Sequence, residues 1–180
     1  EGLGGQGAGI TPIMLSSWVE FMRAEMALAS GNAGAAGGYL NTGITKHINK
    51  VMPYGSLDPD ADSGFFATQA EINAFIDGVG NAFNSADNNG KWDILAVQQF
   101  VANFGNGVVP YNMYRRTGYP VSLQYPVESN SGPFIRTFLY ASNEADTNPN
   151  IPQKPNVNVQ VFWDNNPPSG PAGAGFPFAN

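Results

Sequence analysis

The apolar residues in the first two thirds of the chain recur at helical spacing. Between Pro12 and Ala29 they fall on nearly every face of a helix, which is typical of a helix that lies between other helices. A second helix is predicted from about Ala33 to Val51, where apolar residues recur every three or four positions. Gly37, Gly38 and Gly43 weaken this second helix, but small residues of this kind also permit close approach by a neighbour.

Capping and stop signals delimit three further helices. Thr68 to Glu71 has the Ser/Thr-x-x-Glu form of a capping box, and apolar residues then keep helical spacing as far as Phe83. Another helix is predicted to begin at Asn89-Gly90 and to stop at Gly105, and a shorter one to run from near Pro110 to Gly118. The apolar stripe that indicates the Asn89 helix comprises Ile94, Val97, Val101 and Phe104.

The last third of the chain has a different amino-acid composition. Ten of the fourteen prolines lie from Pro120 onward, which excludes a helix bundle there and favours an extended segment. Phe134 to Tyr140 has the composition of a strand, and Val157 to Trp163 alternates apolar and polar residues as a half-buried strand or an extended wrap would. Met52 to Ala67, with its prolines, glycines and aspartates, is predicted to be a loop.

These elements predict a mainly α fold. Antiparallel helices joined by short turns are the unit of tetratricopeptide-like helical hairpins, although the strict repeat signature is absent. We expect one domain or part of one, with a helical region over residues 12–118 and an irregular, proline-rich C-terminal arm over residues 119–180.

Composition excludes several classes of function. The net charge is −6, and the eight Lys and Arg residues are spread along the chain, so nucleic acid is not expected as a partner. Since the chain has no cysteine, it has no disulfide, zinc thiolate site or cysteine nucleophile, but export remains open. No run of apolar residues is long enough for a transmembrane helix.

The sequence contains only weak indications of a catalytic site. A Ser-His-Asp triad could be built only around His47, the single histidine, and no G-x-S-x-G elbow accompanies it. The pairs Glu20 with Glu25 and Asp87 with Asp93 could in principle serve glycoside hydrolysis, although capping and surface roles are favoured for them.

One loop has the alternation of a calcium site. Asp58, Asp60 and Asp62 place three carboxylates at every second position, which lets oxygen ligands wrap a Ca²⁺ ion. The glycine comes one position late for an EF-hand and Gln69 stands where its last glutamate would be, so a solvated acidic loop is the favoured alternative. Calcium is therefore the one cofactor that the sequence suggests.

Glu25 lies in the middle of the apolar first helix. A carboxylate buried there needs a partner, because an unpaired charge is costly to remove from water. The forked guanidinium of Arg115 or Arg116 is the predicted partner. The alternative is that both arginines are solvated and that the Glu25 carboxylate reaches the surface.

Three segments together resemble the SusD/RagB family of nutrient-binding lipoproteins. The first is the central stretch from Asn89 to Pro120, which contains KWD-I-x-x-Q, FGNG and YRRTGYP. The second is Trp18 to Ala27 (WVEFMRAEMA), and the third is Phe138 to Asn148 (FLYASNEADTN), which is similar to the closing segment of that family. Ala141 stands where the family usually has a proline, and Ile135-Arg136-Thr137 replaces a Pro-Arg-Arg run.

The resemblance implies binding rather than catalysis. A SusD-like protein of the Bacteroidota type is a surface-exposed outer-membrane lipoprotein that captures oligosaccharides or peptides and passes them to a SusC-like, TonB-dependent transporter. Residues 1–180 would be the C-terminal part of its single domain, and the remaining N-terminal part, with the lipid-bearing cysteine, would be its partner. The resemblance assigns no ligand-binding residue to this chain.

Alternatives from other classes remain open at this point. A peptide-binding SusD-like protein, a calcium-stabilised secreted glycosidase and a purely structural scaffold each fit part of the pattern. Trp92, Trp163 and Tyr119 are candidates for stacking on sugar rings, with core packing favoured for Trp92.

The calcium prediction can be tested by chelation. A ligand that binds only the native state stabilises it by mass action, so excess chelator should lower the melting temperature if the Asp58 to Gly64 loop binds Ca²⁺. An unchanged melting temperature in excess chelator would show that the loop does not bind Ca²⁺.

Overall fold

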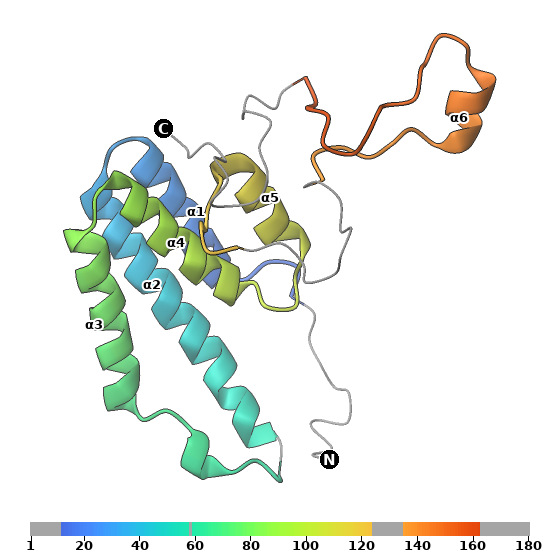
Figure 1. Cartoon of the computed structure of the whole chain (residues 1–180). Helices are drawn as coiled ribbons and strands as arrows, with labels where there is room; N and C mark the ends of the chain where they lie inside the picture. The colour runs from blue at the N-terminus through green and yellow to red at the C-terminus, as the bar shows by residue number, and fades with distance from the viewer. Residues whose placement is uncertain (1–11, 58, 124–134, 163–180) are drawn as a thin grey trace. The chain divides into compact units, whose positions relative to one another are not determined.

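The computed structural model describes residues 12–57, 59–123 and 135–162 and is mainly helical (Figure 1), which confirms the predicted fold class. No strand occurs in these ranges. The α-helices are α1 (Ser16–Ala29), α2 (Ala33–Val51), α3 (Gln69–Ser85), α4 (Asn88–Ala102), α5 (Val108–Thr117) and α6 (Ser142–Thr147). Two 3₁₀ turns, η1 (Met52–Leu57) and η2 (Ser63–Phe65), lie in the predicted loop.

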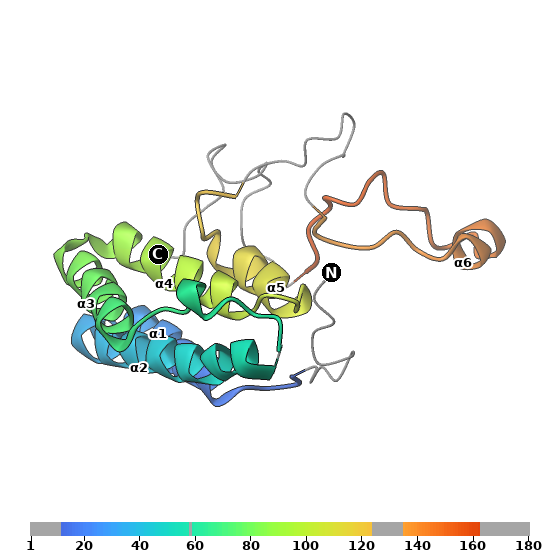
Figure 2. The ribbon, with the colours of Figure 1, turned by 90° about the horizontal axis from the view of Figure 1, so that it is seen from below.

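The chain divides into two compact units, one up to Pro110 and one from Tyr111 onward. Helices α1 to α4 belong to the first unit, where each packs against its neighbour in sequence and α4 also returns to α1. Figure 2 shows α1 and α2 on one side of this bundle and α3 and α4 on the other. The expectation of a single domain stays a prediction.

Local signals explain where these helices begin and end. Thr68 forms both bonds of the predicted capping box with Glu71. Asp87 accepts a bond from the Gly90 amide at 2.7 Å and so caps α4. Gly105 has φ of +84°, the left-handed stop that the sequence predicts.

The start of α1 differs from the prediction, because it begins at Ser16 instead of Pro12. Leu15 has extended dihedrals and provides no side-chain cap. Ile13 and Met14, which the predicted helix would include, are largely exposed. Proline at a first turn permits a helix but does not enforce one, and here no buried contact holds residues 12–15 in it.

The close packing of α1 and α3 against α2 depends on glycines of α2. A β-carbon at position 43 would lie 3.1 Å from the Phe21 ring of α1, closer than carbon atoms normally pack. A β-carbon at position 37 would lie 3.4 Å from the Phe83 ring of α3. Phe21 and Phe83 are both fully buried, so these glycines give the close approach that the sequence suggests.

The fourth helix buries a different face from the one that its apolar stripe predicts. Val101 is 60% exposed and Phe104, just beyond the helix, is 97% exposed, whereas Ile94 and Val97 are half-buried. The physical reason is that the opposite face contains small residues that fit closely against other helices, and Trp18 of α1 donates its indole N–H to Ala102 O at 2.9 Å there. The buried face comprises Trp92, Leu95, Ala96, Gln99 and Ala102.

The two strand-like runs of the C-terminal arm form no regular strand over residues 135–140 and 157–162. The amides of Arg136 and Thr137 both donate to Val157 O, at 2.8 and 3.0 Å, so one carbonyl joins the two runs without a ladder. A short helix, α6, follows the first run. Phe134 and Trp163 lie outside the described residues, as does much of the arm, whose extended character stays a prediction.

The glycine contacts lead to a mutational prediction. Gly43→Ala should destabilise the protein by about 1–3 kcal/mol, because its methyl group would overlap the Phe21 ring. Gly38→Ala is the matched control in the same helix, since a β-carbon there meets nothing within 4 Å. Gly38→Ala should stabilise by about 0.5–1 kcal/mol through helix propensity. Urea unfolding of both variants measures the contrast, and equal stabilisation by both would contradict the packing argument.

Candidate functional site

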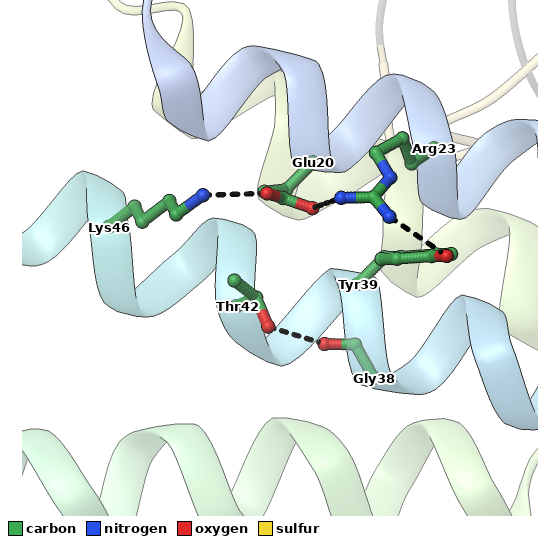
Figure 3. Close-up of polar contacts among 6 residues, drawn as sticks. All are labelled: Glu20, Arg23, Gly38, Tyr39, Thr42 and Lys46. Atoms are coloured by element: carbon green, nitrogen blue, oxygen red, sulfur yellow. Dashed lines mark hydrogen bonds and ion pairs between the residues drawn. The ribbon is translucent and has the colours of Figure 1, made fainter.

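The buried carboxylate of the first unit is that of Glu20 (Figure 3). Lys46 of α2 donates to its Oε1 at 2.6 Å, and Arg23 of α1 donates to its Oε2 at 3.1 Å. Arg23 also donates to the Tyr39 hydroxyl at 3.0 Å and has its guanidinium carbon 4.1 Å from the centre of the Tyr39 ring. The four side chains therefore join α1 to α2 through a charged network.

The electrostatics of Glu20 make it a structural residue. The hydrogen bond from Lys46 holds the pKa of the Glu20 carboxyl below its ordinary value, although burial opposes this effect. Since both oxygens already accept charged hydrogen bonds, Glu20 is ionised and committed to its partners. Such a carboxylate is poorly suited to act as a general acid. Glu25 is only half-buried, and its pairing with Arg115 or Arg116 stays a prediction.

A groove with a volume of about 360 Å³ lies between α3 and α4. Its α3 wall contains Phe75 and Val79, and its α4 wall contains Ile94 and Val97. Asp93 and Gln98 supply the polar groups of the lining. Two residues of the stripe that predicts α4, Ile94 and Val97, therefore belong to one wall of this groove.

The predicted calcium loop is described only in part. Asp62 accepts the Gly64 amide at 2.8 Å and caps η2, and Asp60 is exposed. Asp58 lies outside the described residues. Within the described ranges no three His, Cys, Asp or Glu side chains cluster to hold a metal, so a site that includes Asp58 stays a prediction.

His47 is half-buried in α2. Its Nδ1 is enclosed and finds no hydrogen-bond partner among the described residues, and burial lowers the pKa of the imidazole. The ring is therefore neutral at pH 7. The structural role that the sequence favours for His47 stays a prediction.

The aromatic residues proposed for sugar stacking are placed differently from one another. Trp92 and Tyr119 are buried, which supports core packing, and Trp163 lies outside the described residues. Exposed aromatic rings occur instead at positions that the sequence analysis did not propose for sugar stacking: Phe65, Phe104, Phe138 and Phe162. Phe104 ends the apolar stripe that predicts α4, and Phe138 and Phe162 lie in the two strand-like runs, so these patterns did not indicate exposure.

In the second unit, side chains fix the backbone around Tyr140. The Gln153 amide accepts from Tyr140 N and donates to Tyr140 O, both at 3.0 Å. Lys154 donates to Thr137 Oγ1 at 2.6 Å and has its ammonium 4.6 Å from the Tyr140 ring centre. These bonds close the loop that carries α6 and hold a half-exposed aromatic ring in place.

The Glu20 network predicts a pH-dependent loss of stability. Glu20→Gln should cost about 1–3 kcal/mol at pH 7, because a neutral amide cannot replace two charge-assisted bonds. The folded-state pKa lies below the unfolded value, so the carboxylate stabilises the protein above an ordinary pKa of 4.5 and loses this effect as pH falls further. The stability difference between wild type and variant should therefore shrink below about pH 4.5.

Urea unfolding from pH 7 to pH 3 measures this difference. Glu144→Gln is the control, because it removes a carboxylate from an exposed position on α6 and should change stability by less than about 0.5 kcal/mol. A difference for Glu20→Gln that stayed constant across this pH range would contradict the assigned role.

Comparison with known proteins identifies the family. Residues 8–159 match the model of the SusD-like family, described as SusD and RagB outer membrane lipoproteins. Searches of curated proteins and of solved structures give no match. Because the family match covers most of the chain and agrees with the mainly helical fold, the chain belongs to the SusD/RagB family of outer membrane lipoproteins.

Proposed function

We propose that this chain takes part in capturing oligosaccharides at the cell surface and in delivering them to a SusC-like, TonB-dependent transporter. The observation that carries the proposal is the family match over residues 8–159. Members of this family are outer membrane lipoproteins. They bind nutrients and are not themselves enzymes. We propose in addition that the protein is exposed at the cell surface, that its ligand is a sugar and that its partner is the transporter.

Features of the chain support a neutral, polar ligand. Charged residues and aromatic residues each make up 12% of the chain, and several aromatic rings are exposed. The face of an aromatic ring is apolar and suits the C–H face of a sugar, while amide side chains can bond its hydroxyl groups. Tyr140, held by Gln153 and Lys154, offers such a ring in a fixed backbone.

Membrane attachment through a lipid is consistent with the helices. Within the described ranges, no helix is both long and apolar enough to cross a bilayer. We propose that a lipid anchor holds the protein at the outer membrane.

The test is a binding and copurification experiment on the complete lipoprotein. Native extraction of the outer membrane should recover it with a large β-barrel transporter. Isothermal titration should show saturable binding of one class of oligosaccharide and no turnover of it. Tyr140→Ala should weaken that binding by about five- to tenfold or more if this ring stacks on the sugar, because aromatic contacts of this kind contribute about 1 kcal/mol or more.

A matched control separates ligand contact from folding. Phe65→Ala removes an exposed ring from the first unit and should leave the melting temperature unchanged. Binding of peptides with no binding of any oligosaccharide would contradict the sugar proposal. Hydrolysis of a glycan by the purified protein would contradict the assignment to a binding class.

A further inference from the structure

We propose that the groove between α3 and α4 is a docking site for an amphipathic helix of a partner protein, with a large apolar side chain flanked by lysine or arginine. This inference does not depend on the nutrient ligand. It rests on the shape, the apolar lining and the charge of the groove within the first unit.

The groove exposes more apolar surface than α3 and α4 can bury against each other. Phe75 is 49% exposed at one wall, and Ile94 and Val97 are half-buried at the other. A volume of about 360 Å³ is at the lower end of ordinary ligand pockets and can receive one or two large side chains. Contiguous apolar surface of this kind marks an interaction site when it lies on a folded unit.

The apolar strip continues along α4 beyond the groove. Val97 and Val101 are four positions apart, so their side chains share a face of α4. Val101 is 60% exposed. From Ile94 to Val101 the helix rises about 10 Å, or roughly two turns. An elongated strip of this length between two antiparallel helices fits the apolar face of a third helix better than it fits a compact small molecule.

The charge of the two helices specifies the flanks of the occupant. Asp93 lines the groove, and Glu71 lies on the same face of α3, one turn before Phe75. Helix α3 contains no Lys or Arg, and the one basic residue of α4 is Lys91. Lys91 donates to Ala86 O, at the junction of the two helices, and its single positive charge is outnumbered by the carboxylates of Glu71, Asp77 and Asp93. The local field is therefore negative and favours a cationic partner.

This charge disfavours a second copy of the same chain. The chain has a net charge of −6, and two copies would bring acidic surfaces together. A basic segment of a different protein provides the complementary charge.

The experiment uses the full chain and a fluorescein-labelled synthetic helical peptide with leucines one helical turn apart and lysines beside them. The comparison peptide has glutamates in place of the lysines. Fluorescence anisotropy should show saturable binding of the lysine peptide, at least about tenfold tighter than the glutamate peptide, and binding should weaken with added salt.

Gly78 provides the decisive variant. It lines the groove, and a β-carbon there meets no atom within 4 Å, so Gly78→Trp can fill the groove without displacing the helix backbone. This variant should lower the affinity at least about tenfold, whereas Gly78→Ala should change it less than about threefold. Circular dichroism verifies that both variants keep their helix content.

A pair of charge variants tests the electrostatic part. Asp93→Asn should weaken binding by roughly two- to fivefold, as expected for one partly screened charge pair. Asp77→Asn removes the same charge from α3 at a position outside the groove lining and should have a smaller effect.

Three outcomes would overturn the proposal. The first is equal binding of the lysine and glutamate peptides, and the second is unchanged affinity in Gly78→Trp. The third is self-association of the wild-type chain in analytical ultracentrifugation that Gly78→Trp abolishes, because the groove would then receive a second copy of the chain.

Discussion

The arrangement of the first unit depends on how closely two aromatic rings approach the backbone of α2. A β-carbon at position 43 would lie 3.1 Å from the Phe21 ring, tighter than normal packing, and one at position 37 would lie in contact with the Phe83 ring at 3.4 Å. The two glycines are six positions apart, so they lie on different faces of the helix and can serve α1 and α3 separately. The conformational freedom that glycine adds to the unfolded chain is thus offset by close packing on two sides of one helix.

Capping signals made the helix ends predictable, because they depend on a few neighbouring residues. The capping box at Thr68 and the left-handed Gly105 occur where the sequence predicts them. Where no such signal exists, the prediction fails: α1 lacks a side-chain cap, and its first residue is Ser16. The strand-like runs of the arm fail for a related reason, since strand composition needs a partner strand before it becomes a ladder.

The faces of the helices were less predictable than their ends. Helix α4 has apolar residues on two faces, and periodicity alone cannot tell which one meets the core. The structure buries the face that contains Ala96 and Ala102, because small side chains allow the closest packing, and leaves Ile94 and Val97 at the groove. Periodicity likewise could not tell which carboxylate of α1 is buried most deeply. Glu20 and Glu25 are both in α1, and Glu20 is the one that the structure buries beside Lys46 of the facing helix.

The sequence did not reveal the charged network around Glu20 or the groove between α3 and α4, because both depend on the geometry between helices. A groove exists only when two helices diverge enough to leave apolar side chains uncovered, and its charge depends on which residues of each helix reach its rim. Residues 74–82 and 93–98 come together there through antiparallel packing of α3 and α4. Two residues of the stripe that indicates α4 in the sequence, Ile94 and Val97, thus also belong to a wall of the groove. A helix that is apolar on both faces can pack one against its own fold and keep the other for a partner, and this is the physical basis for assigning an interaction surface to α4.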